Sequence, residues 1–290
     1  MRFYKLATVY VVLCLGVFVG GLFFVATTVY ATPLVIEASD TSEDGSNATS
    51  ATLGITIPDY NEGDLVIVLI NIWQDNNNDT DVTWPSGPEG ETVTSVETGY
   101  GGSGNVDLPL IAFGWFQGAA GGHTSANWDV TTNDTTRFAS AVVIVPAGEY
   151  DSDTPIGATG KTFDTADSTT PGFPAFTANG DDTDGKLLAF IAVDQDPISG
   201  TPSGWTDFVD LDQGRASIVL SGRDTAVSSG ESIDATSWSI AGDAYSAYGF
   251  VVRAAPPAPP EEDTTLTRTM RLFEGFLFKF FSGKMILYGN

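Results

Sequence analysis

One loop of this 290-residue chain carries oxygen-bearing side chains at a spacing that suits a calcium ion (Ca2+). The loop follows an apolar run and reads Asp75-Asn76-Asn77-Asn78-Asp79-Thr80-Asp81. Calcium takes about six to eight oxygen ligands, and alternate residues of a tight loop can aim at one point. The predicted metal ligands are Asp75, Asn77, Asp79 and Asp81. The alternative is a plain polar turn, because Asn and Asp are favoured in turns for conformational reasons.

Two weaker calcium candidates flank a second apolar run in the other half of the chain. Asp181-Asp182-Thr183-Asp184-Gly185 precedes that run, and Asp194-Gln195-Asp196 follows it at the place equivalent to the first loop. The first loop, Asp75–Asp81, lacks the glycine and distant glutamate of an EF-hand. Calcium is the one cofactor that the sequence suggests.

The residues of familiar catalytic sites are largely missing. His123 is the sole histidine, and no Gly-x-Ser-x-Gly elbow provides a nucleophile for it. We interpret His123 as an exposed residue of a glycine-rich loop. Catalytic zinc is excluded, because zinc sites need several His or Cys ligands. Paired carboxylates could act on a polysaccharide, but no pattern singles out a pair. We therefore predict no catalytic residue and a protein that is not an enzyme.

Charge and cysteine content restrict the class of protein further. The chain has 37 acidic and 12 basic residues, a formal net charge of -25. Such a body repels phosphate backbones, which excludes nucleic acid as a partner. The single cysteine, Cys14, lies in the N-terminal apolar segment, so the rest of the chain contains no disulfide or thiolate metal site.

Short apolar runs separated by polar and glycine-rich turns predict an all-β protein. No run keeps helical spacing over three turns. Leu53–Pro58 alternates like a half-buried strand. The expected core strands are Leu65–Ile72, Leu110–Phe116, Phe138–Val145, Leu187–Val193, Ala216–Leu220 and Tyr245–Val252.

Similar segments recur in the same order, which predicts an internal duplication. Gly63–Ile70 resembles Gly185–Ala192, and Ala139–Val145 resembles Ser246–Val252. Leu110–Phe113 with Ile218–Leu220 and Ser125–Val130 with Ala235–Ile240 are further matching pairs. The halves span about 53–160 and 175–254. Each half is too small to bury its own sheet.

We therefore expect one antiparallel β-sandwich, jelly-roll-like, over residues 32–254. Two tandem sandwiches with a boundary near 165–177 are the alternative. Trp128 and Trp238 occupy equivalent places and are interpreted as rings that pack on the sheets, together with Trp84 and Trp205. Stacking on a sugar is the other interpretation for one of these rings.

The N-terminus has the features of an export signal. Basic residues precede the apolar stretch Leu6–Ala26, and Val29-Tyr30-Ala31 fits a cleavage site. Residues 1–31 are thus a predicted signal peptide, although the apolar stretch is long enough to remain as an uncleaved anchor. The predicted location is secreted or at the cell surface. Sequons at Asn47, Asn78 and Asn133 are possible glycan acceptors.

The C-terminus differs in composition from the rest of the chain. A Pro-rich acidic linker, 255–263, precedes a basic and apolar segment, 264–290. Phe276–Phe281, Ser282-Gly283 and Lys284–Tyr288 suggest a hairpin, and 268–277 could instead begin an amphipathic helix. A lone hairpin is unstable in water, so 264–290 should dock on a sister subunit, the cell envelope or its own sandwich.

Several turns resemble those of a loosely defined group of secreted and phage-associated β-sandwich proteins. The residues that carry the resemblance are Gly63–Ile70, Asp153–Gly157, Gly185–Ala192 and Pro202–Thr206. The resemblance implies a surface, appendage or virion-decoration component, and the N-terminal signal favours a cellular surface. We expect a structural or adhesive protein that assembles or anchors through 264–290. A carbohydrate-binding module, with a glycan as partner, and a polysaccharide-acting enzyme are the alternatives.

Overall fold

The computed structural model describes residues 37–43, 52–74, 82–100, 109–124, 126–132, 136–194, 198–212 and 216–257. These residues form strands and one short 3-10 turn, η1 (Gly180–Asp182). The strands of the first half are β1 (Glu37–Glu43), β2 (Thr52–Ile57), β3 (Leu65–Gln74), β4 (Val82–Thr83), β5 (Thr94–Tyr100), β6 (Pro109–Gln117), β7 (Ala126–Thr132) and β8 (Thr136–Val145). Those of the second half are β9 (Ile156–Ser168), β10 (Gly172–Phe173), β11 (Phe176–Thr177), β12 (Lys186–Val193), β13 (Trp205–Leu211), β14 (Ser217–Arg223), β15 (Ser232–Ile233), β16 (Thr236–Ser237) and β17 (Asp243–Val252).

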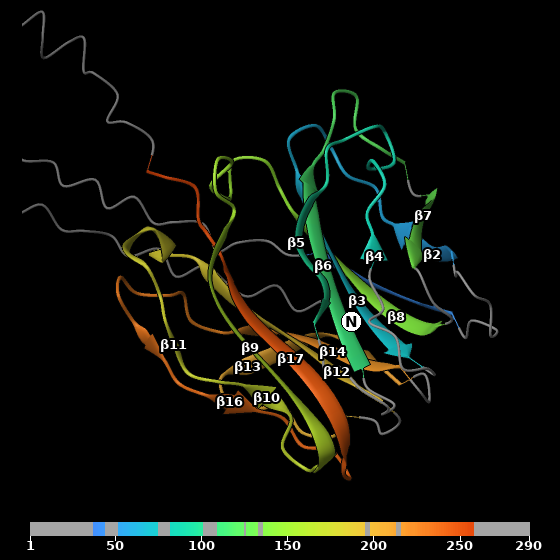
Figure 1. The fold of residues 1–290 in the computed structure, drawn as a ribbon. Helices are drawn as coiled ribbons and strands as arrows, with labels where there is room; N and C mark the ends of the chain where they lie inside the picture. The colour runs from blue at the N-terminus through green and yellow to red at the C-terminus, as the bar shows by residue number, and fades with distance from the viewer. Residues whose placement is uncertain are drawn as a thin grey trace, which may run out of the picture. The chain divides into compact units, whose positions relative to one another are not determined.

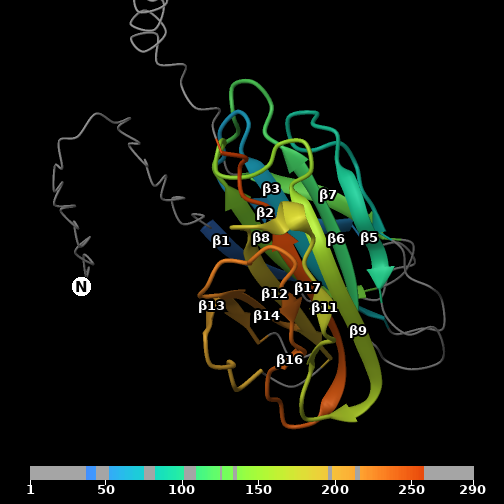
Figure 2. The same ribbon diagram turned by 90° about the vertical axis from the view of Figure 1, so that its left-hand side faces the viewer.

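Two antiparallel five-stranded sheets form the body (Figure 1). The first has the strand order β1-β8-β3-β6-β5, and the second has the order β13-β14-β12-β17-β9. Smaller pieces are the three-stranded sheet β2-β7-β4 and the two-stranded pairs β10-β16 and β11-β15. Figure 2, turned by a quarter turn, shows the strands of the second sheet beside those of the first. The predicted all-β sandwich is confirmed.

The inner faces of the two sheets share one core. Alternate residues of β3, among them Leu65, Ile67 and Leu69, meet Leu188 and Phe190 of β12 in a single buried cluster. The sheets lie strand over strand, with β1 over β13, β3 over β12 and β6 over β17. Because residues of both halves fill this core, one sandwich with a sheet from each half is observed.

The outer face of each sheet is also buried. Val66, Val68 and Ile70 of β3 face β2, β4 and β7 in a second cluster. Leu187, Ala189 and Ile191 of β12 face the segments of β10, β11, β15 and β16 in a third. Burial on both faces explains why β3 and β12 are continuous apolar runs without alternation.

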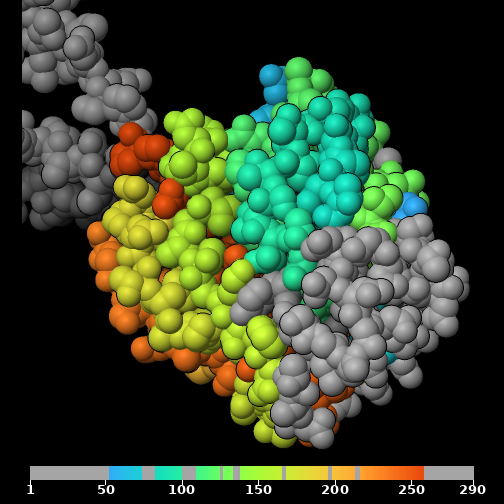
Figure 3. All heavy atoms as spheres, in the orientation of Figure 1, coloured from blue at the N-terminus to red at the C-terminus, as the bar shows by residue number. Residues whose placement is uncertain are grey.

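Polar contacts join the two sheets at one end and at one edge. Asn71 of β3 is fully buried, and its Nδ2 donates to the backbone oxygens of Val193 (3.2 Å) and Ser217 (3.1 Å). At the edge, Lys161 of β9 pairs with Glu97 of β5. Figure 3 shows this edge, where the cyan atoms of the β5 segment lie against the yellow-green atoms of the β9 segment.

The two sheets have the same topology when each strand is numbered by its position along the chain within its own sheet. From one edge to the other, both sheets contain their first, fifth, second, fourth and third strands. The series β1, β8, β3, β6, β5 corresponds to β9, β17, β12, β14, β13. An internal duplication would produce this correspondence. The duplication and the jelly-roll connectivity themselves stay predictions.

The structural correspondence differs by one residue from the sequence match of Gly63 with Gly185. Gly63 has φ +79°, and the only described non-glycine residue with positive φ is Asp184, at +63°. Gly63 N donates to Gly118 O (2.9 Å), and Asp184 N donates likewise to Val227 O (2.8 Å). Gly63 therefore corresponds to Asp184. This shift also brings Val66 and Leu187, both outward-facing, to equivalent positions.

The expected half-buried strand and all six expected core strands are confirmed, with ends shifted by a few residues. The long edge strand β9 and the edge strands β5 and β13 were not expected. The predicted signal peptide 1–31, the segment 264–290 and the three sequons lie outside the described residues. Within the described part of the chain, no helix is long and apolar enough to cross a membrane.

Candidate functional site

The four predicted calcium ligands, Asp75, Asn77, Asp79 and Asp81, lie outside the described residues. Calcium binding there stays a prediction. Across the ranges that the structure does describe, no group of three or more His, Cys, Asp or Glu side chains is placed to hold a metal ion.

The weaker candidate at Asp181–Gly185 contains a carboxylate that already serves the fold. Asp182 lies in η1 and is fully buried. Its oxygens accept hydrogen bonds from Arg253 Nε (2.7 Å), Asn179 N (2.7 Å) and Ala158 N (3.1 Å). The carboxylate thus joins η1 to the start of β9 and the end of β17, and its role is structural.

The side chain of His123 is largely buried, and the interpretation as an exposed loop residue was wrong in that respect. Its side chain is 5% exposed, and Nδ1 lies 2.8 Å from Glu89 Oε1. The ring stacks on Tyr60, with 5.1 Å between centroids. Backbone hydrogen bonds in both directions join the same two residues, from His123 N to Tyr60 O (2.9 Å) and from Tyr60 N to His123 O (3.2 Å). Ring stacking and backbone pairing together hold the imidazole in place.

The contact with Glu89 decides which ring nitrogen of neutral His123 carries the proton. An ionised carboxylate only accepts hydrogen bonds, so Nδ1 must be the donor. Nε2 then has a free lone pair. Nε2 is buried and has no hydrogen-bond partner. Leaving a buried acceptor without a partner costs about 1–3 kcal/mol. The same arrangement, a carboxylate orienting one nitrogen and leaving the other basic, is common where histidine binds or transfers something.

A cavity of about 410 Å3 lies beside this ring. We call it the His123 pocket; it is lined by Asp59, Tyr60, Asn61, Glu89, Gly121, Gly122, His123 and Thr124. Its lining contains two carboxylates and no Lys or Arg. Gly122 has φ +66°, and a Cβ there would lie 2.7 Å from Tyr60 O, so the tight turn requires glycine.

Glu91 is outside the lining of the pocket but accepts hydrogen bonds from two lining residues, Tyr60 and Glu89. It is 6% exposed, and Oε1 accepts from the Tyr60 hydroxyl (2.5 Å) and Ala119 N (3.2 Å), while Oε2 accepts from Glu89 N (2.8 Å). Burial alone would raise the pKa of Glu91, but the hydrogen bonds from Tyr60 and the backbone outweigh it and hold the pKa below its usual value. Burial, with Glu91 and Glu89 nearby, raises the pKa of Tyr60, so its hydroxyl stays a donor.

Glu91→Gln should lower the free energy of unfolding by about 1–3 kcal/mol at pH 7, since the amide cannot accept all of these hydrogen bonds. Because the folded-state pKa of Glu91 is depressed, its stabilisation is present above the unfolded-state pKa and is lost as the pH falls through the folded-state value. Urea unfolding at pH 7 and pH 3 checks this, and the gap between wild type and variant should shrink at pH 3. A gap that stays constant would contradict the linkage.

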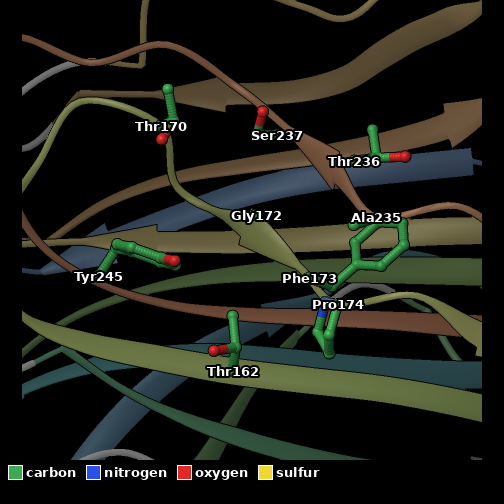
Figure 4. Close-up of a pocket in the computed structure, with 9 residues that line it drawn as sticks. All are labelled: Thr162, Thr170, Gly172, Phe173, Pro174, Ala235, Thr236, Ser237 and Tyr245. Carbon is green, nitrogen blue, oxygen red and sulfur yellow. The ribbon is translucent and has the colours of Figure 1, made fainter.

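A second pocket, the Tyr245 pocket, has a different character. Figure 4 shows the nine residues that line its roughly 270 Å3, and none of them is charged. They are Thr162, Thr170, Gly172, Phe173, Pro174, Ala235, Thr236, Ser237 and Tyr245. The lining combines the hydroxyl groups of four Thr and Ser side chains and of Tyr245 with the apolar rings of Phe173 and Pro174. Such a lining suits a neutral, hydroxyl-bearing ligand.

Neighbouring carboxylates occur on the edge strand β13. Burial, followed by the charges of Asp207 and Asp212, raises the pKa of Asp210. Asp207 accepts hydrogen bonds from the hydroxyls of Thr201 and Ser221. Asp207 is therefore occupied by protein donors and serves the packing of β13 on β14.

The tryptophan rings pack on the sheets, as predicted. Trp128 is 5% exposed and stacks on Trp84, with 5.8 Å between centroids. Trp238 is 1% exposed and meets Trp205 edge-on at 5.3 Å. Each indole N–H of the buried pair donates a hydrogen bond, from Trp128 to Ser86 O and from Trp238 to the Ser221 hydroxyl.

The sequence did not indicate either pocket. Tyr60, Glu89 and His123 come from three loops that only the fold brings together. The one available signal was a sole histidine, His123, directly after two glycines.

Comparison with known protein families, with curated proteins and with solved structures finds no match to this chain. The function must therefore be argued from the chain's own residues.

Proposed function

We propose that this protein is a structural or adhesive component of a cell surface, built as a rigid β-sandwich and attached or assembled through residues 264–290. The acidic body, with the whole chain at a net charge of -25, and the export-like N-terminus support an extracellular place of work. No catalytic residues are assigned in this proposal.

The observation that carries the proposal is that the central strands of both sheets are buried on both faces by the sandwich's own residues. The inner faces cover each other, and the outer faces are covered by β2, β4 and β7 on one side and by the β10–β11 and β15–β16 segments on the other. The body therefore does not need the apolar residues after 264 to complete its core. An apolar segment that the core does not require suits attachment to a partner or membrane surface.

Deleting residues 264–290 should leave the melting temperature nearly unchanged, because no described core residue lies there. Self-association, or retention on cells that secrete the chain, should be lost. Light scattering and cell fractionation measure these two quantities. A matched full-length variant, Phe280→Asp with Phe281→Asp, should behave like the deletion, since it removes apolar character without shortening the chain. Unfolding of both variants would place the segment in the core and overturn the proposal.

Carbohydrate binding is the second candidate, and the uncharged Tyr245 pocket favours it. Thr and Ser hydroxyls both donate and accept hydrogen bonds, as sugar hydroxyls do. None of the nine residues that line this pocket carries a carboxylate, an ammonium or a guanidinium group. A neutral saccharide meets no uncompensated charge there.

Calorimetric titration of the wild type with neutral oligosaccharides tests this candidate. Thr170→Val and Tyr245→Phe should each weaken binding about three- to tenfold, because each removes a hydroxyl from the pocket. Thr83→Val, an exposed change on β4 in the other half, is the matched control and should have no effect. Equal loss in the control and pocket variants would exclude this pocket as the site.

A further inference from the structure

We propose that the Tyr245 pocket binds the terminal residue of a neutral glycan, one sugar ring at the end of a chain, and does not bind the interior of a polysaccharide. This inference rests on the carbohydrate binding considered above as the second candidate function. It adds which part of a glycan the pocket recognises and which chemical groups recognise it. A glycan end would give the adhesive protein proposed above a specific partner.

The size of the pocket limits the ligand to one sugar ring. Its volume is roughly 270 Å3, which is below the range of about 300–1,000 Å3 that encloses a drug-sized ligand. A single hexose ring is smaller than such a ligand, whereas several linked rings are as large or larger. On one side the pocket ends at the β10–β16 pair. These strands are too close for a side chain to fit between them, since a Cβ at Gly172 would lie 2.7 Å from Ser237 Cα.

The aromatic rings at the pocket do not form a platform on which a polysaccharide chain could stack. An extended chain presents the flat, apolar faces of successive rings, which large exposed aromatic side chains can cover. Phe173 and Tyr245 are only 2% and 9% exposed, so their rings belong to the wall. Among the described residues, Phe163 is the only large apolar side chain that is exposed, and it lies on the other face of β9 from Thr162. Hydrogen bonds inside the pocket must then hold the sugar.

Two hydroxyl groups of the lining have opposite hydrogen-bond roles. The Thr236 hydroxyl donates its proton to Asp234 O (3.2 Å), so its lone pairs are left to accept. The Tyr245 hydroxyl accepts from the Gly172 backbone N–H, and burial and the charge of Asp164 raise its pKa, so it keeps a proton to donate. A sugar hydroxyl can both donate and accept, whereas an ammonium group only donates and a carboxylate only accepts. The two roles together therefore fit a polyhydroxylated ring.

The surroundings of the pocket disfavour an acidic sugar. Asp164 of β9 is paired in register with Tyr245 of β17, and its charge contributes to the raised pKa of the Tyr245 hydroxyl. The lining contains no Lys or Arg that could balance a further negative charge. A uronic acid would place its carboxylate near Asp164 without a counter-charge, which costs binding energy. We therefore expect the pocket to prefer neutral sugars.

NMR titration of the full chain with the methyl glycosides of glucose, galactose, mannose and N-acetylglucosamine tests the inference. At least one should bind saturably, with a dissociation constant on the order of 1 mM for so small a ligand. A trisaccharide and a hexasaccharide that end in that sugar should bind within about threefold of the methyl glycoside, because their other rings lie outside the pocket. The corresponding uronic acid should bind at least about tenfold more weakly.

The outcomes separate this inference from the function on which it rests. An affinity that rises more than about tenfold from the methyl glycoside to the hexasaccharide would leave carbohydrate binding in place but would overturn the recognition of a chain end. The absence of saturable binding by all four glycosides and their oligosaccharides would remove carbohydrate binding, and this inference with it.

Thr162→Ile tests whether the sugar lies in the pocket. Isoleucine replaces the hydroxyl with carbon and is larger, and its stiff χ1 keeps the added group in the wall. We expect at least about tenfold weaker binding of the methyl glycoside and of the hexasaccharide alike. Thr131→Ile makes the same change at an exposed position of β7, outside the lining, and should change binding less than about twofold.

Equal effects of Thr162→Ile and Thr131→Ile would place the sugar elsewhere and overturn the inference. If Thr162→Ile fails to fold, Tyr245→Phe takes its place. Because a single ring makes all the contacts, Tyr245→Phe should weaken the methyl glycoside and the hexasaccharide by the same factor. A loss confined to the hexasaccharide would contradict the proposal.

Discussion

Asp182→Ala should lower the free energy of unfolding by about 3–5 kcal/mol, as expected when one partner of a buried ion pair is removed. The carboxylate is fully buried and accepts from Arg253 Nε at 2.7 Å. Its loss leaves the Arg253 guanidinium, largely buried, without that partner. It also leaves the backbone N–H groups of Asn179 and Ala158 without their acceptor. Urea unfolding followed by tryptophan fluorescence measures the change.

The neighbouring residue provides the control for this prediction. Asp181→Ala removes an identical side chain from an exposed position in the same turn, and should cost less than about 0.5 kcal/mol. The double variant Asp182→Ala with Arg253→Ala should lose less than the sum of the two single variants, because it leaves no unpaired charge behind. Similar losses for Asp181→Ala and Asp182→Ala would show that the turn tolerates either change.

The core strands could be predicted because their apolar composition is enough to identify them as buried strands. Strands β3 and β12 are buried on both faces, so they are uninterrupted apolar runs that no surface element could carry. The edge strands β5, β9 and β13 could not be predicted in the same way. They are half-exposed, and their residues are those of polar loops. Pairing with a neighbouring strand, and not local preference, makes them strands.

The one-residue error in matching the halves has a physical cause. The sequence match aligned Gly63 with Gly185, because each glycine precedes a long apolar run. In the second half a non-glycine residue, Asp184, takes that conformation, and Gly185 is needed for space instead. A Cβ at Gly185 would lie 2.7 Å from Val251 and 2.8 Å from two backbone oxygens. The structural correspondence comes from the face of the sheet on which each residue lies. The sequence does not show these faces in strands that are buried on both sides, because the residues of both faces are apolar.

The candidate sites depend on tertiary structure even more strongly. His123 gains its properties from Glu89 and Tyr60, which lie on two other loops. The Tyr245 pocket combines residues of β9, β10, β16 and β17. Sequence reasoning can propose a site where the candidate ligands are close along the chain, as in the calcium prediction for the Asp75–Asp81 loop. It cannot find sites whose members meet only through sheet pairing.

Phe113→Ala should be as damaging as the loss of Asp182, at about 3–5 kcal/mol. Phe113 of β6 is fully buried between the sheets, with 4.7 Å from its ring centroid to that of Phe250 and 5.5 Å to that of Tyr248, both on β17. The loss would be a large part of the roughly 5–15 kcal/mol that stabilises an ordinary domain. Calorimetry and urea unfolding measure it, and Phe163→Ala on β9, where the side chain is 40% exposed, is the matched control with an expected loss below about 1 kcal/mol.

The number of unfolding transitions, one or two, tests the shared core more directly than the midpoint of unfolding does. Because Phe113 belongs to the first sheet and its partners Tyr248 and Phe250 to the second, the halves should unfold together in both the wild type and the variant. The coupling between Phe113→Ala and Phe250→Ala should then exceed about 0.5 kcal/mol, as it does for residues in contact. Two separate transitions in the wild type, with Phe113→Ala shifting only the first, would mean that each half is stable without the other. The inter-sheet core would then contribute little to folding, and a single rigid sandwich would no longer describe the protein.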